Sequence, residues 1–267
     1  MTRLVDVHAH LNFADYDRDR EEVVGRIKAE NLAVINVGTD LKTSREVVDL
    51  ADGKNFWAIV GIHPTETVEI TEESWSKLKE LALNKNTVAI GECGLDYSRL
   101  NNQVIGEREK VIRKQQQDVF ERQIDLAHEV GKPLMLHIRD AYDETLDILN
   151  SKFQILKFTI PGDVHFFAGD TAIAKKFLDL GFVLSFTGVI TFAKEYEEVV
   201  KYVPLERMLS ETDCPFVAPT PYRGKRNEPL YVSEVVKKIA EIKNRPIDEV
   251  AEAIWQNAQN LFGLPNL

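Results

Sequence analysis

Short apolar segments alternate with charged amphipathic segments along almost the whole chain, and this alternation constrains the fold more than any other feature. The apolar segments have the length of buried strands, and the segments between them have the spacing of amphipathic helices. The predicted strands cover residues 5–10, 32–38, 56–61, 87–90, 133–136, a short segment ending near 165, 182–186 and 207–211. The predicted helices cover 17–30, 44–51, 72–83, 107–130, 141–149, 171–180, 195–203, 232–242 and 247–261.

Eight strand and helix pairs in 267 residues predict an α/β fold, a single-domain (β/α)8 TIM barrel over residues 1–267. A doubly wound open sheet is the alternative architecture. The segment 153–162 is ambiguous between helix and strand, so the start of the sixth strand is uncertain. No linker, low-complexity tract or internal repeat interrupts the pattern.

Histidines stand at the ends of the predicted strands. The first strand ends in His8 and His10, and the i, i+2 spacing places both imidazoles on one face. Five of the six histidines in the chain occupy comparable positions, whereas His128 lies inside a predicted helix and outside any motif. In a barrel the carboxyl ends of all strands meet on one face, so these side chains can converge there.

The residues at these strand ends are ligand types for divalent cations. They are His8, His10, His63, Glu92, His137, His165 and Asp213. Imidazoles and carboxylates together suit Zn, Mn, Fe or Mg, and a carboxylate such as Glu92 can bridge two ions. We therefore predict a binuclear site, in which two ions would activate a water and Asp213 could accept its proton.

Composition narrows the class of protein. The chain has only two cysteines, Cys93 and Cys214, which excludes a disulfide scaffold and a thiolate zinc cluster and predicts buried structural thiols. A net charge of −10 argues against a protein that coats nucleic acid, although bound cations can attract a phosphate locally. The sequence lacks an apolar signal region and any run approaching ~20 apolar residues, so we expect no membrane association and a cytoplasmic location.

The motifs resemble those of the TatD family of metal-dependent deoxyribonucleases, within the amidohydrolase-like barrel superfamily. The resemblance spans nearly the whole chain and is carried by residues 6–11, 61–64, 91–97, 133–141, 165–169, 185–188 and 211–229. The most specific part is Thr-Asp-Cys-Pro at 212–215 followed by Tyr-Arg-Gly-Lys-Arg-Asn-Glu-Pro at 222–229. One departure is the segment 152–163, which is longer than the usual family connection.

The resemblance implies which residues hold each ion. His8, His10, Glu92 and Asp213 would hold one ion, and Glu92, His137 and His165 would hold the second. It also implies cleavage of DNA phosphodiester bonds from the 3′ end, with single-stranded DNA or a DNA end as the substrate. Mg is the expected ion, with Mn or Zn as alternatives. The sequence does not fix the oligomeric state, and a monomer is compatible with it.

Several residues are predicted to contact the substrate. His63 is not needed as a ligand and could hold the phosphate or assist the leaving oxygen. Guanidinium groups bind phosphate oxygens in pairs, which makes Arg139, Arg223 and Arg226 candidates. Lys225 and Glu228 lie in the same segment, where Lys225 is equally compatible with a solvated surface and Glu228 could orient an arginine. Aromatic side chains that could stack on bases are Tyr97, Phe166, Phe167 and Phe192.

Two rival functions use the same residues. The first is a metal-dependent hydrolase of carboxylic esters or amides, such as a lactone or an aminoacyl-tRNA ester, because an activated water attacks a carbonyl carbon by the same chemistry. The second is a metal-dependent binding protein without catalysis. The arginines favour phosphate over carbonyl substrates, and the full ligand set with a candidate base favours an enzyme.

Overall fold

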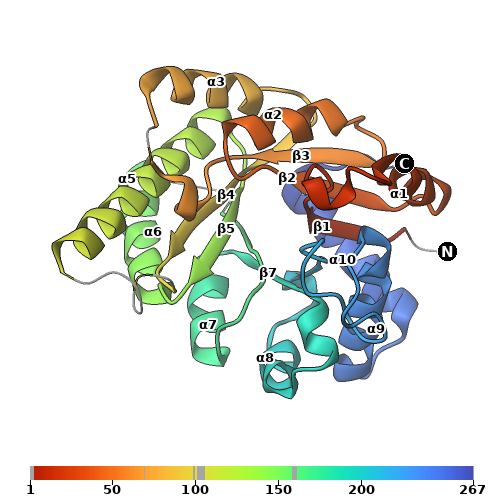
Figure 1. The fold of residues 1–267 in the computed structure, drawn as a ribbon. Helices are drawn as coiled ribbons and strands as arrows, with labels where there is room; N and C mark the ends of the chain where they lie inside the picture. Colours follow the sequence, from red (N-terminus) through yellow and green to blue (C-terminus); the bar gives the residue numbers. More distant parts are fainter. Residues whose placement is uncertain (1–2, 69, 99, 101–105, 158–160, 267) are drawn as a thin grey trace.

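Eight parallel strands follow one another in chain order around a single sheet, and helices surround that sheet (Figure 1). The computed structural model describes residues 3–68, 70–98, 100, 106–157 and 161–266. The strands are β1 (Val5–Ala9), β2 (Ala33–Val37), β3 (Phe56–Val60), β4 (Thr87–Asp96), β5 (Leu134–Arg139), β6 (Gly162–Val164), β7 (Val183–Phe186) and β8 (Met208–Ser210). The helices are α1 (Arg20–Ala29), α2 (Leu41–Leu50), α3 (Glu72–Ala82), α5 (Glu107–Val130), α6 (Tyr142–Leu156), α7 (Thr171–Asp179), α8 (Glu197–Tyr202), α9 (Val232–Lys243) and α10 (Ile247–Phe262).

The last strand returns to the first, so the sheet closes into a barrel. A bridge pairs Ala9 with Cys214, whose carbonyl accepts a hydrogen bond from the His10 N–H at 2.9 Å. The Ser210 hydroxyl donates to the carbonyl of Val5 at 3.0 Å. The (β/α)8 barrel predicted from the alternation is therefore confirmed, and the open-sheet alternative is wrong because the edge strands meet.

Local sequence explains the elements. Every residue of β1, β2 and β3 is buried, since one face of the barrel sheet packs on its interior and the other on helices. Asp40 and Thr43 form a reciprocal capping box at the start of α2. Gly131, with φ of 65°, ends α5 in the left-handed conformation that a glycine adopts without steric cost.

The largest difference from the sequence prediction is the length of β4. Its pairing with β5 continues as far as Asp96 opposite Arg139, whereas the predicted strand covered only residues 87–90. Glu92 therefore lies within a strand rather than after one. The ambiguous segment becomes the end of α6 and the start of β6, while residues 158–160 lie outside the described part.

Both cysteines are buried and unpaired, as predicted for structural thiols. Cys93 lies in the main apolar core, and Cys214 lies in a smaller cluster beneath the loop that follows β1. Among the described residues, no helix is both long enough and apolar enough to span a bilayer.

Candidate metal centre

The seven predicted ligand-type residues converge at the carboxyl ends of the strands. His8 lies on β1, Glu92 on β4 and His137 on β5, each pointing into one buried cluster. His10, His63, His165 and Asp213 stand just beyond the ends of β1, β3, β6 and β8. The barrel geometry thus brings together residues up to 205 positions apart in the sequence, the separation of His8 and Asp213 (213 − 8).

Glu92 occupies the centre of the cluster, with one carboxylate oxygen facing each half. Its Oε2 lies 3.5 Å from His8 Nε2 and 3.9 Å from His10 Nε2. Its Oε1 lies 2.6 Å from His137 Nδ1 and 3.5 Å from His165 Nε2. A carboxylate so placed has one oxygen available to each half of the cluster, and its bridging of two ions stays a prediction.

The first half contains His8, His10 and Asp213. The Nε2 atoms of the two histidines are 3.1 Å apart, and Asp213 Oδ1 lies 3.5 Å from His10 Nε2. Two imidazole lone pairs at this separation repel unless a proton or a cation lies between them and the carboxylates. This pair therefore favours a cation in the first half of the site.

Hydrogen bonds to the outer ring nitrogens fix which nitrogen faces the cluster. His10 Nδ1 lies 2.9 Å from the carbonyl oxygen of Val37, to which it can only donate. His165 Nδ1 lies 2.9 Å from the carboxylate of Glu211 and donates to it in the same way. In the neutral form of each ring the Nε2 lone pair is then directed inward, as ligation requires.

His137 lies between two carboxylates. Its Nδ1 faces Glu92 and its Nε2 lies 3.2 Å from Asp96 Oδ2, on the same strand as Glu92. Burial would lower the pKa of His137, but hydrogen bonds to Asp96 and Glu92 raise it above the ordinary value. When Asp96 accepts the Nε2 proton, the Nδ1 lone pair is the one available to a cation.

His63 differs from the other histidines in its tautomer. The backbone N–H of Thr65 donates to His63 Nδ1 at 3.1 Å, which leaves the ring proton on Nε2, 3.6 Å from Glu92 Oε1. Burial lowers the pKa of His63 to about 4, so the ring is neutral near pH 7. Although His63, Glu92 and His137 are close enough to share an ion, this tautomer makes His63 a hydrogen-bond donor rather than a ligand.

The carboxylates of the cluster are ionised. Burial would raise the pKa of Glu92, but the surrounding imidazoles hold it well below its usual range. Burial likewise opposes the charge of Asp213, and the neighbouring imidazoles of His10, His165 and His8 keep its pKa low. A buried negative charge with inward-facing imidazole nitrogens is the donor set that divalent cations need.

A second layer of buried acids supports the ligands, and it was missed in the sequence analysis. Glu211 is fully buried and accepts hydrogen bonds from His165, from the Phe166 N–H at 2.7 Å and from the Ser185 hydroxyl at 2.7 Å. Burial would lower the pKa of His165, but Glu211 raises it to about 10. The Ser185 hydroxyl oxygen also lies 2.8 Å from Asp163, a buried acid whose pKa burial raises well above its usual range, so that the protonated carboxyl of Asp163 can donate to Ser185.

Asp6 joins the first strand to the loop that carries Asp213. Its carboxylate accepts hydrogen bonds from the Thr212 N–H at 2.9 Å, the Thr212 hydroxyl at 2.6 Å and the His8 N–H at 3.2 Å. The N–H of Asp213 in turn donates to the carbonyl of His8 at 2.9 Å. Two ligand-bearing segments are therefore held in one register by a single buried acid.

A signal for these supporting residues is present in the sequence. Glu211 precedes Asp213 by two positions, as His8 precedes His10, and Asp96 follows Glu92 by four. Even spacing along an extended segment places side chains on the same face, so both acids face the side of the sheet that carries the ligands. The pattern identifies candidates, but it does not say which carboxylate ligates and which orients a ligand.

The predicted anion contacts fare differently from one another. Arg226 is engaged, because both of its terminal nitrogens bond Asp19 at 2.7 and 2.6 Å, and Glu228 lies 3.1 Å away. Glu228 thus orients Arg226, as proposed from the sequence, but this pairing leaves Arg226 poorly placed to bind phosphate. Arg139 and Lys225 are exposed.

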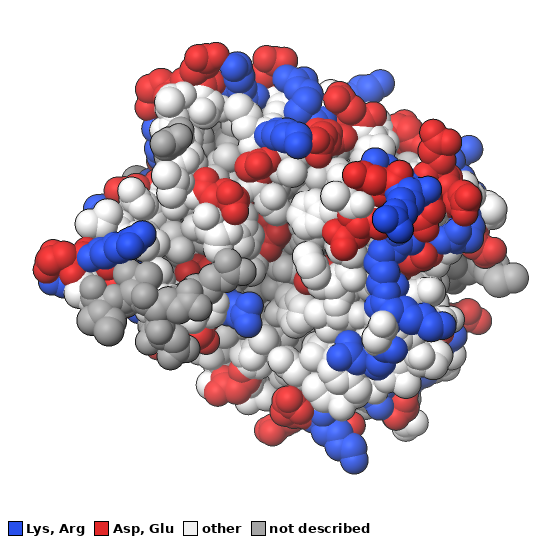
Figure 2. Space-filling model, in the orientation of Figure 1, with Lys and Arg blue, Asp and Glu red and all other residues white. Residues whose placement is uncertain are grey.

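Arg223 has a different environment from Arg226. One terminal nitrogen donates to the carbonyl of Ala218 at 3.0 Å, and the guanidinium lies 3.9 Å from the ring centroid of Phe192. Its positive charge has no acidic partner among the contacts of the described residues. On the face drawn in Figure 2, basic and acidic side chains are interspersed rather than separated, so attraction of a polyanion must be local.

The four aromatic residues suggested for base stacking are not equivalent. Tyr97 and Phe167 are buried and cannot present a ring to a substrate, because the first packs under Arg113 and the second against Phe186. Phe166 is half-buried beside His165. Phe192 is the only one of the four that is exposed.

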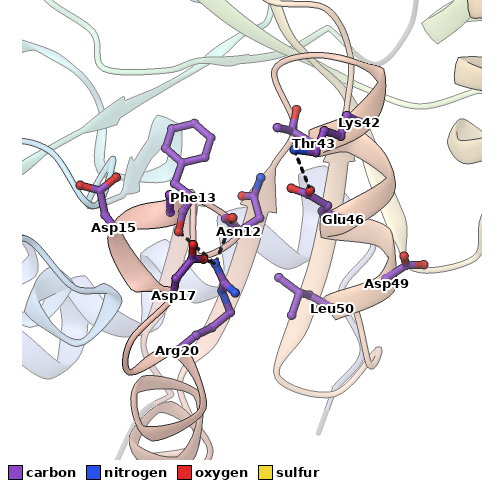
Figure 3. A pocket seen from close by; sticks show the side chains of 11 residues that line it. Asn12, Phe13, Asp15, Asp17, Arg20, Lys42, Thr43, Glu46, Asp49 and Leu50 are labelled. Carbon is purple, nitrogen blue, oxygen red and sulfur yellow. Dashed lines mark hydrogen bonds and ion pairs between the residues drawn. The ribbon is translucent and has the colours of Figure 1, made fainter.

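A cavity of about 610 Å³ lies beside the metal centre, between the loop that follows β1 and helix α2 (Figure 3). Phe13 lines this cavity, and its ring also stacks on His10 with centroids 4.5 Å apart. The acidic residues of the lining are Asp15, Asp17, Glu46 and Asp49, against the cations Arg20 and Lys42. The cavity is thus acidic and separated from the ligands by one phenylalanine.

Fold and site together place the chain among the (β/α)8-barrel metal-dependent hydrolases. A model of the family described as TatD related DNase matches residues 5–263, so the chain belongs to this family. The chain is 41% identical to the uncharacterized metal-dependent hydrolase YabD of Bacillus subtilis, over 97% of this chain and 98% of the relative. It is 35% identical to the uncharacterized metal-dependent hydrolase YcfH of Escherichia coli K12, over 97% and 95% of the two chains.

A solved structure gives the same result for the fold. The TatD homolog YJJV of Escherichia coli superposes with a TM-score of 0.86 at 27% identity, covering 99% of each chain. The family assignment made from the sequence motifs is therefore confirmed, and the chain is a metal-dependent hydrolase acting on ester bonds.

Removing the Glu211 carboxylate tests its role in orienting His165. We expect Glu211→Ala to weaken binding of Mn²⁺ by about 10- to 100-fold, because the imidazole loses the partner that fixes its tautomer and direction. Titration calorimetry on metal-stripped protein measures this loss. Ser185→Ala is the control, since it removes a neighbour of Glu211 and leaves the His165 hydrogen bond intact; equal losses in both variants would contradict the role.

Proposed function

We propose that this protein hydrolyses phosphodiester bonds of DNA, acting from the 3′ end of a single strand or of an unpaired end, with two divalent cations. The observation that carries the proposal is the central Glu92, whose two oxygens face separate sets of nitrogen and carboxylate ligands. Membership of a family described as related to DNases supports DNA as the substrate. We propose Mg²⁺ as the natural ion, with Mn²⁺ and Zn²⁺ as alternatives.

The ligands divide into two sets around Glu92. His8, His10 and Asp213 would hold one cation with Glu92, and His137 and His165 would hold the other. The bound cations supply Lewis acidity and lower the pKa of a coordinated water. Imidazole and carboxylate ligands suit this role for several metals, so the donor set fits the group.

The remaining steps use the protein's own side chains. Asp213 carries a carboxylate at the edge of the cluster and is the group that would accept the proton of the attacking water. The neutral His63 would donate its Nε2 proton as a hydrogen bond to a phosphate oxygen of the substrate. Arg139 and Arg223 would bind neighbouring phosphates, because each offers a guanidinium without a carboxylate partner among its described contacts.

The rival activity on carboxylic esters or amides uses the same activated water. The pair of available guanidiniums favours phosphate over carbonyl substrates, because a phosphodiester carries a negative charge that a carboxylic ester lacks. His63 does not discriminate between the two, since its Nε2 proton can be donated to a carbonyl oxygen as well as to a phosphate oxygen. The net charge of −10 does not oppose a short contact with the end of a strand, since bound cations would supply positive charge inside the cluster.

The experiment is hydrolysis of single-stranded DNA labelled at its 5′ end by metal-stripped protein, titrated with Mg²⁺ and Mn²⁺. The expected result is a ladder of products shortened from the 3′ end, dependent on metal and lost in Asp213→Ala. A phosphate-free carboxylic ester is tested in parallel. Intact DNA with metal-dependent ester cleavage would move the protein to the carbonyl hydrolases, and turnover that survives EDTA would contradict the metal centre.

A further inference from the structure

Two phenylalanines stand at the same distance in sequence from two candidate ligands. Phe13 follows His10 by three residues, and Phe216 follows Asp213 by three. Each phenylalanine is the last residue of a tight turn that starts at the candidate ligand. The Phe13 N–H donates to the His10 carbonyl at 3.1 Å, and the Phe216 N–H donates to the Asp213 carbonyl at 3.0 Å. Both rings are therefore tied to the metal centre by local backbone geometry.

The two rings meet beside the ligands. Phe13 stacks on the His10 ring with an interplanar angle of 12°, and the edge-to-face contact between Phe13 and Phe216 has centroids 6.3 Å apart. Phe13 is half-buried, whereas 51% of Phe216 is exposed. A large apolar ring thus stays in contact with solvent within one turn of a candidate ligand.

In each turn, one side chain from outside the turn donates hydrogen bonds to two backbone carbonyls and so fixes the conformation of the turn. Arg20 donates to the carbonyls of Leu11 at 2.6 Å and Phe13 at 3.0 Å. The buried side chain of Asn227 donates to the carbonyls of Thr212 at 2.9 Å and Phe216 at 2.7 Å. Ordering these loops in advance removes an entropic cost that a ligand would otherwise meet on binding.

Charge indicates on which side of these rings a phosphate chain would run. The cavity beyond Phe13 is bordered by four carboxylates and two cations, one of which, Arg20, is occupied by backbone carbonyls and Asp17. Figure 3 shows Asp15 and Asp17 on the same loop as Phe13, which disfavours a phosphate there. On the side of β7, the guanidinium of Arg223 lies over the ring of the exposed Phe192, which places a positive charge there.

We propose that Phe216, backed by Phe13, stacks on the unpaired nucleobase next to the scissile phosphate. This inference rests on the proposed nuclease function and deepens it by assigning a base-binding residue that the sequence analysis did not single out. The base lies on the exposed ring, its phosphate lies at the metal centre, and the chain leaves toward Arg223. Base stacking on an aromatic ring tolerates every base, so the site favours unpaired ends over paired ones without reading sequence.

The test compares two single-stranded oligonucleotides in the presence of Mg²⁺, one with normal bases and one with abasic residues at its three 3′-terminal positions. We expect wild type to prefer the normal oligonucleotide, and Phe216→Ala to lower kcat/KM on it by about tenfold or more. The variant should cleave the abasic oligonucleotide as wild type does. Phe216→Trp should restore the preference, because the indole ring also stacks.

Tyr202→Ala is the matched control, since it removes an exposed ring, 44% accessible, at the end of α8. It should leave both rates unchanged. Equal losses on both oligonucleotides, or no loss on the normal one, would overturn the stacking role while the nuclease function stands. If wild type cleaves neither oligonucleotide but hydrolyses a carboxylic ester, the proposed function fails and the stacking role fails with it.

Discussion

Glu92→Ala should lower metal-dependent turnover of single-stranded DNA by on the order of 10³-fold or more, because it removes the carboxylate shared by both halves of the site. The remaining imidazoles would have no common anion to hold two cations at the required separation. Initial rates at saturating Mg²⁺, together with calorimetric counting of Mn²⁺ sites, measure the effect. We expect at least one of the two proposed cation sites to be lost.

The fold should survive this substitution, since Glu92 faces the ligand cluster while the barrel is held by its apolar core. Far-UV circular dichroism of the variant should match that of wild type. Glu73→Ala, an exposed glutamate at the start of α3, is the control and should leave turnover unchanged. Global unfolding of Glu92→Ala would reassign Glu92 to a structural role, and full turnover would refute the shared-carboxylate site.

Gly94→Ala should destabilise the protein by about 3 kcal/mol or more, because two independent costs add at this position. Gly94 has φ of 140°, a conformation that residues with a Cβ rarely adopt. A Cβ built there would lie 2.1 Å from the carbonyl oxygen of His137 on the paired strand. The backbone of β5 would have to move, and it carries a candidate ligand.

Urea denaturation of metal-free protein measures this loss, and metal affinity should fall with it. Gly25→Ala on α1 is the matched control, since nothing lies within 4 Å of its added Cβ. Alanine in a helix interior is favoured over glycine by roughly 0.5–1 kcal/mol, so this control should be neutral or slightly stabilising. An unchanged stability for Gly94→Ala would show that β4 and β5 are not packed as closely as described.

The glycine also explains a limit of the sequence analysis. The predicted strand ends at residue 90, just before Gly91 and Gly94, and glycine usually interrupts regular structure. In the barrel they instead permit close approach to Met135 and His137 of the neighbouring strand. Only the position of β5 shows that these glycines allow β4 and β5 to pack closely and do not form a turn.

The arginines show a second limit. The run from 222 to 229 predicted a basic loop on the ligand side, and the chain does return there after β8. The partners of each guanidinium depend on residues far away in sequence, however. Asp19, some 207 positions before Arg226, binds it in two places, while Arg223 pairs with an aromatic ring instead of an acid.

Sequence alone determined the alternation of strands and helices, the identity of the ligand-type residues and the family. These features are local, since strand and helix periodicity, ligand chemistry and motif spacing are all properties of neighbouring residues. The convergence of the histidines followed from them, because a closed parallel barrel brings every carboxyl strand end to one face.

Tertiary structure decided the orientation and availability of each side chain. The direction of the His165 lone pair depends on Glu211, 46 positions away. The tautomer of His63 depends on the hydrogen bond from the Thr65 N–H, and the amino-acid sequence does not specify the geometry of that turn. Phe216 becomes a candidate for base stacking only because Phe13 lies beside it, across the junction of β1 and β8. Hydrogen-bond direction, ion pairing and exposure are properties of contacts between distant segments, and these exist only once the barrel has closed.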